Sequence, residues 1–345
     1  TAMGLSALRV NTSNYNAAFG KSALELNTTG EQNVAIGAYT LDANTTGSNL
    51  VAIGAYALSS ATTMSSSIAI GRRAAFSATG AGDIIAIGYQ AAHELSTGAH
   101  NIAIGQNALY NGTTAAYNIG IGKDALEANV TGTQNIAIGF DSLTTATGVD
   151  YSIAIGVNSQ KSNQSGDYNV SLGWQTMKET TTGNSNVAIG NEAMEKNTTG
   201  TQNTALGRTA LYNNTTADNN TAIGQSSLKS NTTGAANTAV GRTALFTNQT
   251  TDNLTAVGYA ALYANTTGTN GVAVGKDALQ ANTTGNNNTA VGLEALQTNT
   301  TGDQNTAIGT GALASNSTAD NNTACGRAAL GLNTTGTNNV AVGAL

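Results

Sequence analysis

The sequence predicts an all-β fold, a repetitive parallel β-solenoid (β-roll) in which each coil takes 17 residues. Three observations lead to this fold class. A glycine that follows a small and an apolar residue returns every 17 residues from Gly20 to Gly343 without a slip. The chain contains no proline, so nothing interrupts a ladder of backbone hydrogen bonds. All 13 Lys and Arg and all 19 Asp and Glu fall on six positions of the repeat, which marks the outside of the coil.

The periodicity makes residues 1–345 a single repeat array of about twenty coils, rather than the two globular domains that the length suggests. Only the first repeat, which ends at Gly4, is out of phase, because the segment after it is one residue short. Residues 59–182 are the more divergent coils, and any specific contact surface is expected there. Both ends of the chain lie within a repeat and lack a capping segment, so we expect a part of a longer fibre.

Positions are numbered here forward from the repeat glycine. The run that ends in this glycine, such as "NVAIG" at 33–37, is short and β-branched, so it predicts a strand of about four residues. Alternation places Val34 and Ile36 on one face and Ala35 on the other. Both faces stay uncharged in every coil. We therefore expect one face to line the interior of the coil and the other to be covered by a neighbouring chain.

The segment "xxALxxN" that follows the glycine is either a second strand or a single helical turn. The "NTTG" at positions +7 to +10 predicts a turn in which Asn caps its own backbone and Gly accepts a positive φ. Stacked in register, the Asn and Thr residues are expected to form ladders along the solenoid. Asp recurs at +11, as in Asp218 and Asp320, and we interpret it as a hydrogen-bond acceptor for the turn. A single carboxylate per coil makes a weak calcium cage.

The sequence contains no group of residues typical of an active site. His93 and His100 each stand in a variable region and are interpreted as exposed, and no nucleophile lies near a base, so we expect no enzyme activity, cofactor or metal. Cys325 occupies the apolar position before Gly326 and is expected to be buried. The net charge of −6 argues against nucleic-acid binding, and no apolar run is long enough for membrane insertion of this segment.

Aromatic residues at variable positions give the only candidate binding residues. Tyr151, Tyr168 and Trp174 could contact surface glycans, because aromatic rings stack on sugars, although packing along a shaft explains such rings as well. A host-cell surface glycan or protein is therefore a candidate partner besides the chain itself. The regular Thr pairs also suggest an ice-binding solenoid, but they lie in a turn rather than on a flat strand. Uncapped ends are compatible with end-to-end filaments.

The repeated "NVAIG", "NTAIG" and "NIAIG" resemble the head repeats of trimeric autotransporter adhesins of the YadA type, and the unit "GxxALxxNTTGxxNTAIG" resembles shaft repeats of bacteriophage tail fibres. The resemblance covers essentially the whole chain. It implies a left-handed parallel β-roll that packs as a homotrimer, outside the cell, on a virion tail fibre or a bacterial cell surface. The adhesin repeat is usually shorter, so the extra residues must widen a turn.

The function that this resemblance implies is mechanical. The chain would be a structural fibre shaft that spaces and presents a receptor-binding tip. A carbohydrate-binding solenoid and a self-assembling extracellular filament are the alternatives. The sequence does not separate a phage from a bacterial fibre, because it contains no stalk, anchor or chaperone domain.

Overall fold

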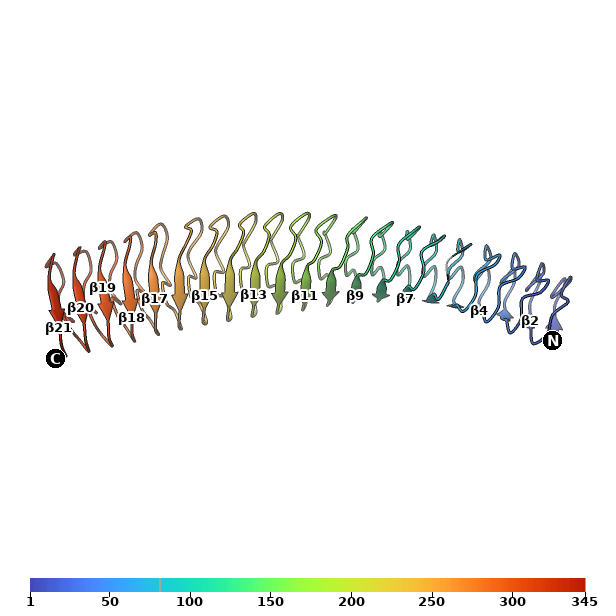
Figure 1. Cartoon of the computed structure of the whole chain (residues 1–345), viewed down its shortest axis with the longest axis horizontal. Helices are drawn as coiled ribbons and strands as arrows, with labels where there is room; N and C mark the ends of the chain where they lie inside the picture. Colours follow the sequence, from blue (N-terminus) through green and yellow to red (C-terminus); the bar gives the residue numbers. More distant parts are fainter. Residues whose placement is uncertain (81, 345) are drawn as a thin grey trace. The chain divides into compact units, whose positions relative to one another are not determined.

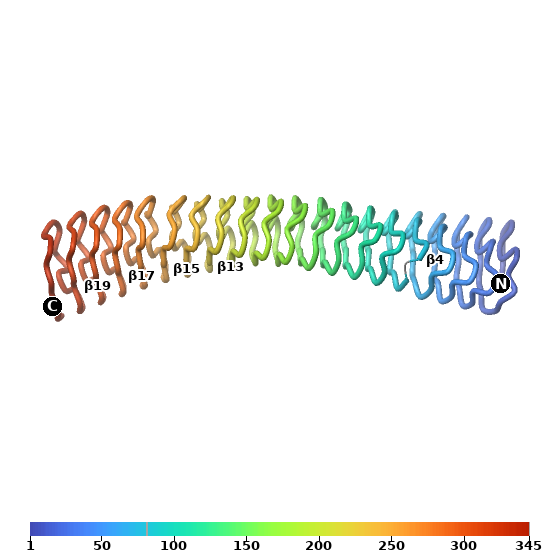
Figure 2. The backbone as a smooth tube through the Cα atoms, turned by 45° about the horizontal axis from the view of Figure 1, so that its top comes forward, coloured from blue at the N-terminus to red at the C-terminus, as the bar shows by residue number. Residues whose placement is uncertain are grey.

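The computed structural model describes residues 1–80 and 82–344, and in these residues it contains strands and turns but no helix. The coils form two compact units, Thr1–Ser171 and Leu172–Leu345. Within each unit, successive coils stack on one another (Figure 1), and the backbone makes one turn per coil (Figure 2). The predicted all-β parallel solenoid is confirmed.

One strand recurs in each coil and is three residues long, apart from the two-residue β1. This is shorter than the expected four residues, because each strand stops at the repeat glycine, whose φ lies between +124° and +141°. The strands of the first unit are β1 (Ala2–Met3), β2 (Ala17–Phe19), β3 (Val34–Ile36), β4 (Val51–Ile53), β5 (Ile68–Ile70), β6 (Ile85–Ile87), β7 (Ile102–Ile104), β8 (Ile119–Ile121), β9 (Ile136–Ile138) and β10 (Ile153–Ile155). The boundary between the units falls within β11 (Val170–Leu172). The strands of the second unit are β12 (Val187–Ile189), β13 (Thr204–Leu206), β14 (Thr221–Ile223), β15 (Thr238–Val240), β16 (Thr255–Val257), β17 (Val272–Val274), β18 (Thr289–Val291), β19 (Thr306–Ile308), β20 (Thr323–Cys325) and β21 (Val340–Val342).

Neighbouring strands pair in parallel and in register, so that each residue lies beside the residue 17 positions further on, as in Ala205 beside Ala222. The short first coil keeps this alignment, since Ala2 pairs with Ala18. Equivalent residues therefore form columns along each unit. The 17-residue period seen in the sequence is the distance along the chain between stacked neighbours.

Backbone hydrogen bonds join the coils around their whole circumference and not only at the strand. In the coil that begins at Gly275, the amides of Gly275, Asp277 and Asn287 donate to the preceding coil, and those of Leu279, Ala281, Thr283 and Thr289 donate to the following coil. Opening one coil therefore breaks bonds on every side at once, which makes each unit stiff along the stacking direction.

The two turns after the strand replace the second strand or helical turn considered from the sequence. Ala278 donates to the carbonyl of Gly275 and Asn282 to that of Leu279, each across three residues. Non-glycine residues at +2, +4 and +12 adopt positive φ, for example Asp277 at 56°, Leu279 at 50° and Asn287 at 55°. Each of them turns the peptide plane over, so that amides can donate alternately to the preceding and the following coil.

The expectation that the glycine at +10 accepts a positive φ is wrong. Positive φ in the glycines occurs at the repeat position and at Gly311, not at +10. At +10 the requirement is space: a Cβ on Gly285 would lie 2.5 Å from the carbonyl oxygen of Gly302 in the next coil. Glycine is favoured there because the backbones of adjacent coils approach closely.

The interior of each coil is thin and partly polar. Ala at +15, Ala at +3 and Leu at +4, such as Ala273, Ala278 and Leu279, are fully buried. Buried Asn side chains form two ladders at +7 and +13, as the sequence predicted. At +7, Asn282 Nδ2 donates to Asn265 Oδ1 and to the carbonyl of Gly285, both at 3.0 Å. These bonds satisfy amide groups that would otherwise be buried without partners.

One coil of the first unit has a polar core in place of the usual Ala and Leu. Ser159, Gln160 and Ser171 occupy +3, +4 and +15, and all three are fully buried. Gln160 Nε2 donates to Ser171 Oγ at 2.8 Å, and the hydroxyls of Ser159 and Ser171 lie 2.6 Å apart. Gln160 Oε1 accepts from Asn163 at 3.1 Å. The hydrophobic core of this unit ends just before this coil, at Ala154.

We expect these three polar residues to be replaceable only together. Gln160→Leu leaves buried donors and acceptors unpaired and should destabilise the first unit by about 1 to 3 kcal/mol. The triple change Ser159→Ala, Gln160→Leu and Ser171→Ala restores the common core and should be neutral or stabilising. Urea unfolding of both variants measures the difference. Equal destabilisation by the single and triple changes would contradict this account.

Candidate interaction surfaces

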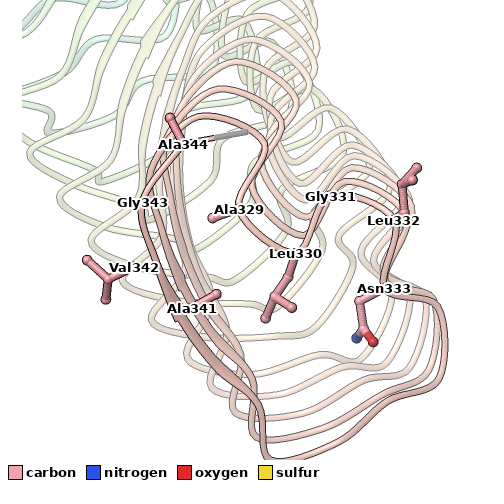
Figure 3. A pocket seen from close by; sticks show the side chains of 9 residues that line it. All are labelled: Ala329, Leu330, Gly331, Leu332, Asn333, Ala341, Val342, Gly343 and Ala344. Atoms are coloured by element: carbon pink, nitrogen blue, oxygen red, sulfur yellow. The ribbon is translucent and has the colours of Figure 1, made fainter.

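The outward face of the strands is an uncharged surface that recurs in every coil of each unit. In β2 to β20 the central residue is buried, and the residues on either side of it are partly exposed, such as Ile36 at 41%. Figure 3 shows this alternation in β21, where Ala341 points into the coil and Val342 points out. The outward residues of β3 to β10 are all Val or Ile, and those of β12 to β20 are mostly Thr, Val, Ile or Leu. Continuous exposed apolar strips of this kind mark interaction sites.

Cys325 lies on this strand face. The sequence suggested a buried thiol, but the structure shows a free and exposed cysteine in the last residue of β20. The expectation of burial came from the apolar residues that usually occupy position +16. It was wrong because the side chain at +16 points away from the interior of the coil. Cys325 is the only cysteine in the chain, so it is a native chemical probe of what covers the strand face.

The structure brings together two of the three candidate glycan contacts. Tyr151 and Tyr168 occupy position +12 of adjacent coils, and their rings stack with centroids 5.2 Å apart and planes 2° from parallel. They are 45% and 58% exposed. The facing sides of the two rings cover each other, so a sugar could stack only on an outer side. Trp174, 45% exposed, follows β11 in the second unit and does not belong to this pair.

A second stack of rings lies at positions +2 and +5 of the first unit. It runs through Tyr39, Tyr56, Phe76, His93 and Tyr110. His93 is only 7% exposed, so its expected exposure is wrong: the register places its ring between those of Phe76 and Tyr110. Its Nδ1 lies 2.7 Å from Glu94 Oε1. His100 is exposed, as expected, and lies 3.5 Å from Asp83.

The recurring Asp at +11 is a hydrogen-bond acceptor, as the sequence indicated, but it acts between coils rather than within its own turn. Asp218 Oδ1 accepts the backbone N–H of Thr201 at 2.6 Å, and Asp303 accepts that of Asn286 at the same distance. Asn286 plays the same part for Thr269. The carboxylate therefore serves as the acceptor for a backbone N–H of the preceding coil.

Glu195, at position +5 of the second unit, is a largely buried carboxyl group. Its side chain is 10% exposed, Oε2 has no hydrogen-bond partner, and Lys178 Nζ lies 3.9 Å from Oε1. Burial raises the pKa of Glu195, and the nearby Glu192 and Glu179 raise it further, against the opposing effect of Lys178.

This raised pKa predicts a pH-dependent gain from Glu195→Gln. The folded-state pKa of Glu195 lies above its unfolded value, so stability falls as pH rises from the unfolded pKa through the folded one. The neutral Gln removes that loss. We expect Glu195→Gln to be more stable than the parent at neutral pH and to lose this advantage below the ordinary carboxyl pKa. Urea midpoints measured across this range test the prediction, and an equal gain at low pH would argue against it.

A hollow of 490 Å³ opens at the end of the last coil, lined by Ala329, Leu330, Gly331, Leu332, Asn333, Ala341, Val342, Gly343 and Ala344 (Figure 3). In the earlier coils of this unit, the residues at the equivalent positions are covered by the coil that follows. The hollow is therefore the uncovered end of the core, and we assign no ligand to it.

In residues 1–80 and 82–344, no three His, Cys, Asp or Glu side chains come close enough to share a metal ion. The same residues contain no helix of the length and apolarity needed to cross a membrane. No protein-family model matches the chain, and a search of curated proteins finds no significant relative.

Proposed function

We propose that this chain is the shaft of an extracellular fibre, a phage tail fibre or bacterial surface adhesin, that holds a receptor-binding tip away from its base. Three copies pack around a common axis through their strand faces. The observation that carries the proposal is the uncharged strand face, which runs through every coil of each unit although its side chains are partly exposed. The sequence resemblance to trimeric fibres agrees with it.

The mechanism of such a shaft is mechanical. Bonds around the whole circumference resist bending and local opening, and the number of coils sets the length. A single solenoid leaves the Val, Ile and Leu of its strand face in water. Packing three of these faces together removes that apolar area, at roughly 25 cal/mol per Å² buried.

The solution mass of the full chain tests the proposal. Light scattering on a sizing column should give a sharp species at three times the chain mass, and a monomer at all concentrations would refute the trimeric shaft. Ile104→Lys with Ile121→Lys puts two charges on the strand face of β7 and β8 and should weaken the assembly. Ala128→Lys is the matched control, because position +6 already carries a lysine at Lys196.

Cys325 supplies a second readout of the same proposal. Its exposed thiol should react quickly with a maleimide in a dissociated chain and slowly in the assembly, because the strand face is then covered. Rapid reaction of a trimeric species would mean that the copies meet through another surface.

A further inference from the structure

Two edges border the strand face in every coil. The start edge consists of positions +11 and +12, just before the strand, and the end edge consists of position +1, just after the repeat glycine. Side chains on both edges reach solvent, such as Tyr168 on the start edge and Tyr259 on the end edge. Any second copy that covers the strand face would bring its own edges next to these.

The two edges carry charges of opposite sign without an exception. The end edge contains seven cations and no acid: Lys21, Arg72 and Lys123 in the first unit, and Arg208, Arg242, Lys276 and Arg327 in the second. The start edge contains eight acids and no Lys or Arg: Glu31, Asp83, Asp150 and Asp167 in the first unit, and Asp218, Asp252, Asp303 and Asp320 in the second. The other six Lys and Arg and eleven Asp and Glu, at +2, +5 and +6, are mixed in sign.

Pairing within one chain does not account for this segregation. The strand lies between the edges and spans about 10 Å, which is too far for an ion pair. Several end-edge cations instead contact groups on their own side of the coil: Lys123 pairs with Asp124 at 2.9 Å, and Arg242 lies over the ring of Tyr259.

The charges on the two edges also lie at similar heights along the stack. Coils rise by about 4.8 Å each, so residues of one coil stay within reach of long side chains at the same level of a second copy. In four places, a cation that follows one strand and an acid that precedes the next strand lie within about one coil rise of each other along the stack. These pairs are Lys21 with Glu31, Arg72 with Asp83, Arg208 with Asp218, and Arg242 with Asp252.

Symmetry decides which edges would meet. If copies point the same way and are related by rotation about the fibre axis, the start edge of one copy lies beside the end edge of the next. If they point in opposite directions, each edge meets its own kind, so acids face acids. Like charges in apposition weaken an interface and opposite charges orient it.

We infer that the start and end edges form a seam of ion pairs between neighbouring copies of this chain, and that this seam makes the copies parallel. The inference rests on the proposed multi-chain shaft and adds to it the residues that set its polarity. The partner that covers the strand face is a second copy of this chain. A second copy places cations of its end edge beside the acids of the start edge, and acids of its start edge beside the cations of the end edge.

The test reverses charges on one edge. Arg208→Glu with Arg242→Glu places acids beside the start edge of the neighbour and should weaken assembly by about tenfold or more at low salt, with a much smaller effect at high salt. Adding Asp218→Asn and Asp252→Asn should recover part of the loss. Asn286 shows that an amide at +11 keeps the hydrogen bond to the preceding coil. Lys196→Glu with Lys229→Glu is the matched control, since it makes the same charge change away from the strand face.

Polarity is read from Cys325. Parallel copies hold these thiols at the same height along the fibre, but each thiol lies next to the end edge and so faces the start side of its neighbour. A direct disulfide is therefore not required, and prolonged reaction of the assembly with a flexible bismaleimide should link pairs of chains through Cys325 in high yield. A monomeric parent refutes both the shaft and the seam. An assembly without linkage at Cys325 means that the copies are not parallel. If linkage forms but Arg208→Glu with Arg242→Glu behaves like the control, the seam is refuted while the shaft proposal stands.

Discussion

Gly258→Ala should open the stack of coils locally in the second unit. The φ of Gly258 is +141°, which is strained for any residue with a side chain, and a Cβ there would clash with the backbone carbonyl of Gly275 in the next coil. The position of the added Cβ and that of the carbonyl are both set by the main chain, so no change of rotamer relieves the clash. Backbone strain and overpacking together predict a loss of about 2 to 6 kcal/mol.

Hydrogen exchange of the peptides around residues 241–275 measures this loss where it occurs, because coils of a solenoid open locally. Gly311→Ala is the matched control. Gly311 has a φ of +66° and open space around its Cβ direction, and other coils carry ordinary residues at the same position. Its effect should stay within about 1 kcal/mol. Similar losses from the two variants would mean that close stacking does not explain the repeat glycine.

Asn282→Ala should be the next most damaging change that we predict. Asn282 stands in the middle of the +7 ladder, donating to Asn265 Oδ1 and accepting from Asn299 Nδ2 at 2.9 Å. Its removal leaves a buried acceptor and a buried donor without these partners. We expect a loss of about 2 to 4 kcal/mol, seen in urea unfolding as a lower midpoint.

Asn44→Ala provides the comparison, because Asn44 lies at a ladder end. The next coil has Ala61 at +7, so Asn44 Oδ1 is buried without a donor already. Its Nδ2 still donates to Asn27 Oδ1 at 2.7 Å. Asn44→Ala therefore breaks fewer bonds and should cost about 1 kcal/mol less than Asn282→Ala. An equal or larger cost would contradict the view that the ladder acts through paired neighbours.

The candidate surface could be predicted only in part from the sequence. The uncharged faces of the strand follow from alternation, and Tyr151 and Tyr168 are recognisable as exposed rings. Their mutual stacking is a consequence of residues 17 apart lying side by side. The same neighbour relation encloses His93 between Phe76 and Tyr110, which made its expected exposure wrong.

The sequence by itself determined the period, the strand in each coil and the division between charged and uncharged positions. These follow from composition at each position, because buried charges and interrupted ladders are costly wherever they occur. The backbone conformation was decided by stacking. Leu279 takes a positive φ because its amide must point toward an acceptor in the adjacent coil. Gly285 does not take a positive φ, and glycine is needed there because its backbone lies close to that of the adjacent coil. Cys325 is exposed for a related reason: the direction of a strand side chain depends on which face the coil closes upon, and that is a property of the folded turn.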